Sequence, residues 1–132
     1  MSELLPTSIN GIPTRVIDLD PLSRDSPRVF LKVIARVGET PRDGEVALAF
    51  IDGATVYAVR VKGGSGRDVL MAYLAERGYV TDETPATEGI GGKQATRLGA
   101  GAGQFLYTNG DVFYYVNSKD DPLASALLEQ LP

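Results

Sequence analysis

A glycine-rich stretch before a helix-like segment is the pattern in this sequence that most resembles a site for chemistry. Residues 61–70 read VKGGSGRDVL, an apolar segment that leads into three glycines and then into helical spacing. Such a loop binds phosphate when its backbone N–H groups converge on the anion at a helix N-terminus, where the helix dipole adds positive charge. The residues of this hypothetical anion loop are Lys62, Gly63, Gly64, Ser65, Gly66 and Arg67.

Two features of the same loop favour a plain turn. It lacks the Gly-Lys-Ser/Thr ending that gives phosphate loops a charge for the phosphate and a hydroxyl for a metal ion. It follows a hairpin strand, so the crevice that doubly wound folds offer to nucleotides is not expected here. We therefore interpret residues 63–68 as a strand-to-helix turn, and binding of a phosphate or small molecule, with or without catalysis, is the alternative.

A second glycine run, GAGAG at residues 99–103, is also interpreted as a connection. A dinucleotide fingerprint leads from its glycines into a helix. Here the run leads into QFLYTNGDVFYYV, which has the alternation of a hairpin. The run therefore predicts a mobile or bulged connection between strands.

The residue types that most often carry catalysis are missing or scattered. The chain has no cysteine and no histidine, which excludes thiol nucleophiles, zinc–thiolate sites and the commonest general base. The paired carboxylates lie in turn-like or capping contexts, where they bind backbone N–H groups or face water. These pairs are Asp18 with Asp20, Asp82 with Glu83, and Asp120 with Asp121. We predict no catalytic residue, no metal site and no cofactor, and expect that the chain is not an enzyme.

The charge of the chain argues against nucleic acid as a partner. The net charge is −4, and the 13 lysines and arginines form no cluster that could follow a phosphate backbone. The apolar runs are too short to span a bilayer. The opening MSELLPTSING has no basic start and no long apolar core, so the chain as given is expected in the cytoplasm. If Met1 replaces a removed leader, an extracytoplasmic location is expected instead.

An internal repeat organises the chain. INGIPTRV at residues 9–16 is echoed by IGGKQATRL at 90–98. AFIDGATVYAVRV followed by DVLMAYL is echoed by LYTNGDVFYYVNS followed by LASALLEQL. We predict one domain over 1–132, made of two halves at about 8–78 and 89–132, each a strand, a hairpin and a helix. Residues 80–89, VTDETPATEG, are the expected connector.

The turns and caps give the expected elements. Asp52-Gly53 and Asn109-Gly110 lie between alternating apolar runs, as in two-residue hairpin turns. Cap-like residues start helices near Ser65 and near Asp120, and an inserted helix is expected over about 27–37. The fold class is therefore α+β: an antiparallel sheet of about six strands, with the two repeated helices on one face and the inserted helix on the other.

Both faces of the hairpins are largely apolar, so the sheet needs two covers. If the inserted helix covers the alanine-rich first hairpin, then Leu106, Phe113 and Tyr115 remain uncovered as a binding surface. The alternative is that loops, the N-terminal LLPTSI or sheet twist hide these residues. The first case predicts a non-catalytic binding or interaction domain, with a homodimer or another protein as partner.

Three segments carry a resemblance to known proteins. LLPTSING, VALAFIDGATVYAVRV and GDVFYYVNSKDDPLASALLEQLP resemble a set of uncharacterised bacterial domains with an L-P-x-x-I-x-G opening and a hairpin-helix-LP close. Many of those domains occur in exported or lipid-anchored proteins. The resemblance implies an α+β fold and an extracytoplasmic setting, and it brings no catalytic residues.

Overall fold

The computed structural model describes residues 1–79 and 85–132. The elements of the first half are η1 (Ser2–Leu4), β1 (Ser8–Ile9), β2 (Ile12–Pro13), β3 (Arg15–Leu19), α1 (Arg28–Val37), η2 (Pro41–Asp43), β4 (Gly44–Ile51), β5 (Ala54–Val61) and α2 (Gly66–Glu76). Those of the second half are β6 (Glu88–Ile90), β7 (Lys93–Arg97), β8 (Gln104–Asn109), β9 (Val112–Ser118) and α3 (Asp121–Gln130). Part of the expected connector, residues 80–84, lies outside the described residues.

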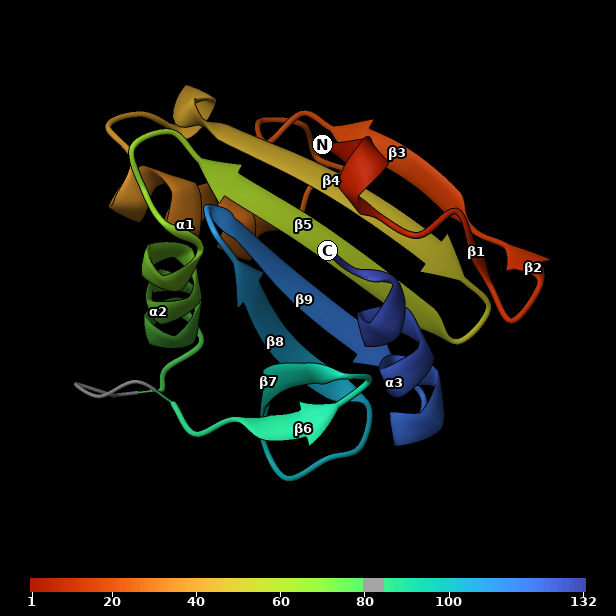
Figure 1. Cartoon of the computed structure of the whole chain (residues 1–132). Helices are drawn as coiled ribbons and strands as arrows, with labels where there is room; N and C mark the ends of the chain where they lie inside the picture. Colours follow the sequence, from red (N-terminus) through yellow and green to blue (C-terminus); the bar gives the residue numbers. More distant parts are fainter. Residues whose placement is uncertain (80–84) are drawn as a thin grey trace.

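The strands form one antiparallel sheet in the order β3-β4-β5-β9-β8-β7-β6, with β1 and β2 as a separate small hairpin (Figure 1). This arrangement confirms the expected α+β class with an antiparallel sheet. In the described part of the chain the sheet has seven strands where about six were expected. The extra strand arises at Gly91 and Gly92, which both have positive φ and turn the chain from β6 back into β7.

The two central hairpins differ by one residue in the position of their glycine. In the first, Ile51 pairs with Ala54, so Asp52 and Gly53 form the turn as predicted. In the second, Asn109 pairs with Val112, so the turn is Gly110-Asp111 and the predicted Asn109-Gly110 turn is wrong. Gly110 has φ +62°, as expected for glycine in the first position of such a turn.

This one-residue difference places equivalent residues of the two halves on opposite faces of the sheet. Directly paired residues of antiparallel strands point to the same face, and neighbours along a strand point to opposite faces. Tyr57 is paired with Tyr115, so these two side chains point to the same face. Tyr114, the equivalent of Tyr57 in the repeat, therefore points to the opposite face. The helix that follows β5 and the helix that follows β9 must therefore cover different faces.

The helices follow this rule. Buried residues of α1 and α2 share one core with Val46, Val59 and Phe113, on what we call the α1/α2 face. Buried residues of α3 share a second core with Val56 and Tyr114, on the α3 face. Figure 1 views the sheet from the α3 side, with α3 and η1 in front of the strands and α1 behind them. The expectation that α2 and α3 lie together on one face is wrong. It assumed that Gly53 and Gly110 occupy the same position in their turns, whereas Gly53 is the second turn residue and Gly110 the first.

The α3 face is closed by three separate parts of the chain. Leu127 and Leu128 of α3 are buried against it, and Leu5 and Ile9 of the N-terminal segment are buried beside them. The hydroxyl of Tyr107 donates a hydrogen bond to the Pro132 carbonyl at 2.8 Å, which ties the C-terminus to the same face. The N-terminal segment thus forms part of the core.

Candidate functional site

One end of the α1/α2 face carries large side chains that stay partly exposed. Ile17, Leu48, Tyr57 and Tyr115 stand directly opposite one another across four neighbouring strands. Phe50 lies one pair further along β4, opposite Arg15. Ile17 is 43% exposed, and the other four residues are partly exposed. We call these five residues, Ile17, Leu48, Phe50, Tyr57 and Tyr115, the open patch.

The next set of paired residues on the same face lies beneath the helices and shows where the covered part of the sheet ends. Val46, Val59 and Phe113 are paired with one another across β4, β5 and β9, and all three are buried. The strands are longer than the part of the sheet that the helices cover. Strands β4 and β5 have eight residues each, or about 26 Å, whereas α1 and α2 lie against each other at one end of the strands. The other end keeps its large side chains without a described helix above them.

Aromatic rings form the border between the covered and the open end. The Phe30 ring of α1 lies edge-on to Tyr57 at 5.0 Å, and the Tyr73 ring of α2 lies edge-on to Tyr115 at 5.4 Å. These distances are favourable for aromatic pairs. On the outer side, the Arg15 guanidinium lies over the Phe50 ring at 5.2 Å. The open patch is therefore held on four paired strands and bordered by the edges of α1 and α2.

The open patch offers apolar and aromatic contact rather than charged or metal-binding groups. Burial raises the pKa of Tyr57, so its phenol stays neutral at physiological pH. The Tyr115 hydroxyl makes a long hydrogen bond to the Gln104 amide oxygen at 3.4 Å. Within residues 1–79 and 85–132 no group of acidic residues is arranged to hold a metal ion. The arrangement can bind an apolar or aromatic surface, with amide and hydroxyl groups at the rim.

Of the three residues expected at an uncovered surface, one lies in the open patch. Tyr115 is partly exposed, whereas Leu106 is 1% exposed and Phe113 is 0% exposed. Both of the latter belong to the core beneath α2, which contacts β8 and β9. The prediction that Leu106 and Phe113 are uncovered is wrong because α2, rather than α1 alone, lies on this face. The exposed surface therefore lies nearer to β3 and β4 than the predicted one, which was on β8 and β9.

The 63–68 loop is closed by its own side chains. The Ser65 hydroxyl accepts a hydrogen bond from the Asp68 amide at 3.0 Å, and the Asp68 carboxylate accepts one from the Ser65 amide at 2.9 Å. The hydrogen bond from the Ser65 backbone lowers the pKa of Asp68. A negative charge from the chain itself thus already stands at the N-terminus of α2, where an anion would bind.

Two of the three glycines of this loop are explained by close contacts, and the third, Gly63, by its φ of +82°. A Cβ on Gly66 would lie 2.5 Å from the Val112 carbonyl oxygen, and one on Gly64 would lie 2.4 Å from Cγ1 of Val37. The Gly66 amide also donates to the Gly110 carbonyl at 2.9 Å, which anchors the start of α2 on the second hairpin. These contacts support the interpretation of the loop as a turn.

A groove of about 590 Å³ beside the loop has mixed charges. Arg42, Arg60 and Lys62 line it together with Asp43, Glu45 and Asp111. Arg60 is paired with Glu45 at 2.7 Å. Because the acidic residues match the basic ones in number, this groove does not favour an anion.

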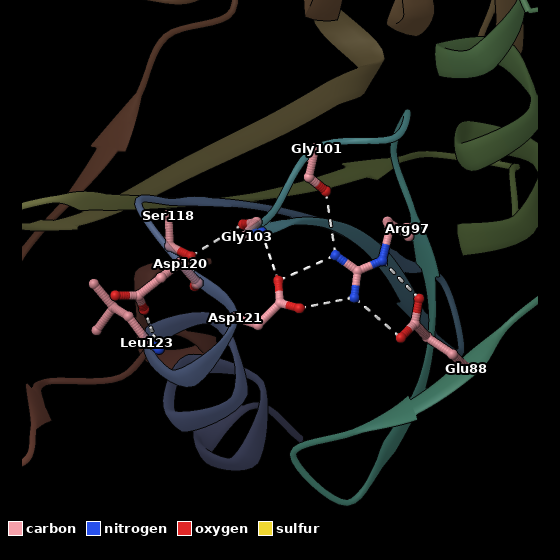
Figure 2. Close-up of polar contacts among 8 residues, drawn as sticks. All are labelled: Glu88, Arg97, Gly101, Gly103, Ser118, Asp120, Asp121 and Leu123. Atoms are coloured by element: carbon pink, nitrogen blue, oxygen red, sulfur yellow. Dashed lines mark hydrogen bonds and ion pairs between the residues drawn. The ribbon is translucent and has the colours of Figure 1, made fainter.

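The second glycine run is fastened by an ionic network that sequence reasoning missed (Figure 2). The Arg97 guanidinium binds the Glu88 carboxylate, the Asp121 carboxylate and the Gly101 carbonyl oxygen. Asp121 also accepts a hydrogen bond from the Gly103 amide at 2.7 Å. The hydrogen bond from Arg97 lowers the pKa of Asp121. One arginine thus links β6, β7, the glycine run and the start of α3.

Gly103 fixes the end of this run. Its φ is +79°, and a Cβ there would lie 2.2 Å from the Ser118 carbonyl oxygen. Its own carbonyl accepts hydrogen bonds from the Ser118 amide at 2.9 Å and the Ser118 hydroxyl at 3.0 Å. As interpreted from the sequence, the run is a connection between strands, but these hydrogen bonds hold it firmly where a mobile or bulged connection was expected.

A second hollow lies between the β1–β2 hairpin and the start of α3. It measures about 410 Å³, and Ile9, Ile12, Ile51 and Leu123 line it. Ile12 is 57% exposed there, while Lys119 and Asp120 stand at the rim. Sequence reasoning missed this hollow because the β1–β2 turn at Asn10-Gly11 was taken as part of a longer strand.

Comparison with protein-family models, with curated proteins and with solved structures gives no match for this chain. The resemblance to uncharacterised bacterial domains therefore stays a prediction. Among the described residues, no helix has the length and apolar character needed to cross a membrane.

Proposed function

We propose that this chain is a non-catalytic binding or interaction domain that receives an apolar surface of its partner on the open patch. The observation that carries the proposal is the row of Ile17, Leu48, Tyr57 and Tyr115, which are in direct register and partly exposed. A row of the same face one pair further along is buried. Large side chains kept at the surface of a rigid sheet are typical of contact surfaces.

The composition of the patch suits a protein partner or an extended apolar ligand. Tyrosine combines a large apolar ring with a hydroxyl that can remain in water, and it is enriched at interfaces. Arg15 and Gln104 supply polar groups at the rim. Burial of apolar surface stabilises a complex by about 25 cal/mol per Å² before the costs of association are subtracted.

The alternative, a small-molecule domain, has its best support away from the glycine loop. The hollow beside α3 is concave and lined by Ile9, Ile12 and Leu123. Its size is in the range of ligand pockets, which are clefts of about 300–1,000 Å³. The experiment below separates this hollow from the open patch.

The test uses bis-ANS, a probe for apolar surface, with amide NMR spectra of the full chain. We expect the probe to shift the amide signals of Leu48, Tyr57 and Tyr115. Leu48→Gln keeps the size of the side chain and removes its apolar end, so we expect bis-ANS to bind about tenfold more weakly to this variant. Ile12→Gln, the matched change in the hollow beside α3, should leave the affinity unchanged.

Two outcomes would contradict the proposal. Shifts confined to the hollow, together with loss of affinity in Ile12→Gln, would favour the small-molecule alternative. Equal affinity of the wild type and Leu48→Gln would show that the open patch binds nothing apolar.

A further inference from the structure

The two edges of the sheet are unequal. At one edge, β6 has three residues and is followed by the tight turn at Gly91 and Gly92. At the other edge, β3 has five residues, RVIDL, without proline, and among residues 1–79 and 85–132 it pairs with β4 alone. Natural proteins shield edge strands by shortness, proline, bulges or a covering element. Within the described residues, β3 has no proline and no element bonded along its outer backbone, although Arg15 and Asp18 are charged and η1 contacts the strand. Its central residue Ile17 is 43% exposed.

The phase of the hydrogen bonds decides which backbone groups of β3 point outward. The Lys62 amide donates to the Asp43 carbonyl at 2.9 Å, which extends the β4–β5 ladder and fixes its phase. In an antiparallel sheet, residues of a strand bond alternately to one neighbour and to the other. The residues of β4 that bond to β3 are therefore Val46, Leu48 and Phe50, which are paired with Leu19, Ile17 and Arg15.

The N–H and C=O groups of Val16 and Asp18 consequently point away from the sheet. No described residue makes a backbone hydrogen bond with them on the outer side. Asp18 is exposed and Val16 is partly exposed. Two residues of β3 thus offer a donor and an acceptor each to another strand.

We propose that two copies of this chain pair along β3, antiparallel, about a two-fold axis that passes between the two Ile17 residues. In this register Val16 stands opposite Asp18 of the second copy, and Asp18 stands opposite Val16 of the second copy. Each of these pairs exchanges two backbone hydrogen bonds. The two Ile17 side chains then lie next to each other on the α1/α2 face, where each covers apolar surface of the other.

Charge and prior bonding exclude the neighbouring two-fold registers. An axis at Asp18 would place the two Asp18 side chains directly opposite each other, and like charges in that position are destabilising. An axis at Val16 would pair Asp18 with Thr14, whose amide already donates to the Thr7 carbonyl at 3.0 Å. The register at Ile17 meets neither obstacle.

The side chains of β3 are also compatible with those of β3 in a second copy. In the Ile17 register, Arg15 stands opposite Leu19 of the second copy, so no like charges meet on the α1/α2 face. On the α3 face the Asp18 carboxylate accepts hydrogen bonds from the Ser2 amide at 2.9 Å and the Ser2 hydroxyl at 3.1 Å. The carboxylate beside the seam is thus already held within its own copy. A second copy is for these reasons the partner that β3 fits.

The pairing would extend the proposed binding surface. The open patch reaches the edge of the sheet at Ile17, so the patches of two copies would form one continuous apolar face on the joined sheet. This consequence rests on the proposed function, whereas the edge pairing rests on β3 alone. The experiment keeps the two apart.

The test is a charge exchange at Ile17, read by sedimentation equilibrium of the full chain over a dilution series. The wild type should be a dimer that dissociates on dilution. Ile17→Lys alone and Ile17→Glu alone should each raise the dissociation constant by about tenfold, because like charges then meet at the axis. An equimolar mixture of the two variants should restore the dimer, since opposite charges meet there. Ile12→Lys, at an exposed isoleucine outside β3, should remain dimeric.

Amide hydrogen exchange gives the second readout. The amides of Ile17 and Leu19 bond to β4 and should be protected at every concentration. Those of Val16 and Asp18 should become protected only as the dimer forms. A monomeric wild type at millimolar concentration would overturn the proposal. A dimer in which Val16 and Asp18 exchange as in the monomer would overturn it as well.

The Leu48→Gln variant separates this inference from the proposed function. Leu48 lies on β4, one strand away from the proposed seam. We expect the variant to dimerise like the wild type while it binds bis-ANS more weakly. Loss of dimerisation in Leu48→Gln would contradict edge pairing and favour association through the face.

Discussion

The two faces of the sheet begin from similar sequence and end with different surfaces. Both carry alternating apolar residues from β4, β5, β8 and β9. On the α3 face, α3, the N-terminal segment and the C-terminus all contribute to the cover. On the α1/α2 face, two helices lie against each other at one end of the strands. The number of large side chains a face leaves exposed thus depends on where its covering elements lie.

Residue size matches this difference. The β4–β5 residues under the N-terminal segment and α3 include small ones, Ala47, Ala49 and Ala58, which let the covering chain approach closely. The same strands present Leu48, Phe50 and Tyr57 to the other face, and these are partly exposed. On the same two strands, the open end of the α1/α2 face therefore carries larger side chains than these alanines of the α3 face.

The largest expected effect compares the covered and the open end of the α1/α2 face. Phe113→Ala removes a ring that is 0% exposed beneath α2, and it should lower the free energy of unfolding by about 3–5 kcal/mol. Tyr115→Ala, two residues further along β9, should cost less than about half of that because its ring is partly exposed. Urea unfolding of the two variants and the wild type measures both values. Equal losses would show that the open end is as well packed as the covered end.

The same pair of residues shows what the sequence could predict and what it could not. The alternation placed Phe113 and Tyr115 correctly on one face of β9, and the cap-like residues Ser65 and Asp120 located α2 and α3. The inserted helix α1 was also located, although no side chain caps its start. The cover of that face depended on the turn at Gly110. A glycine can take the first or the second place of a two-residue turn, and the choice reverses which way every later residue points relative to the first hairpin.

Other features were hidden for a related reason. Arg97 meets Glu88 and Asp121 only after three separate segments have been brought together, so no local pattern marks the network. The short strands β1, β2 and β6 are too brief for periodicity to reveal them. Their turns at Asn10-Gly11 and Gly91-Gly92 are visible signals, and a search for such dipeptides could have found them.

A smaller effect is expected from the N-terminal part of the closed face. Leu5→Ala should lower the free energy of unfolding by about 2–3 kcal/mol, because Leu5 is buried in the core of the α3 face. Leu22→Ala is the matched control at a leucine that is 48% exposed, and it should cost less than about 0.5 kcal/mol. Thermal or urea unfolding distinguishes the two. A loss below 0.5 kcal/mol in Leu5→Ala (roughly the control's value) would mean that the N-terminal segment does not cover this face in solution.

The smallest effect concerns the cap that starts α2 and so fixes where the cover of the α1/α2 face begins. Ser65→Ala removes the acceptor for the Asp68 amide and should lower the free energy of unfolding by about 1 kcal/mol. Asp68 adds a pH dependence. Its pKa is lowered in the folded chain, chiefly by the hydrogen bond from the Ser65 backbone, so its contribution is present above the unfolded pKa of about 3.9.

That contribution is lost as the pH falls through the lower pKa of the folded state, because the Asp68 carboxylate binds a proton more tightly in the unfolded chain than in the folded one. Asp68→Asn removes the charge, so the difference in stability between the wild type and this variant should shrink as the pH falls from 7 to 3. Urea unfolding at each pH measures the difference. A difference that stays constant over this range would show that the charge of Asp68 does not hold the start of α2, and that Ser65 and the Gly66–Gly110 hydrogen bond do so without it.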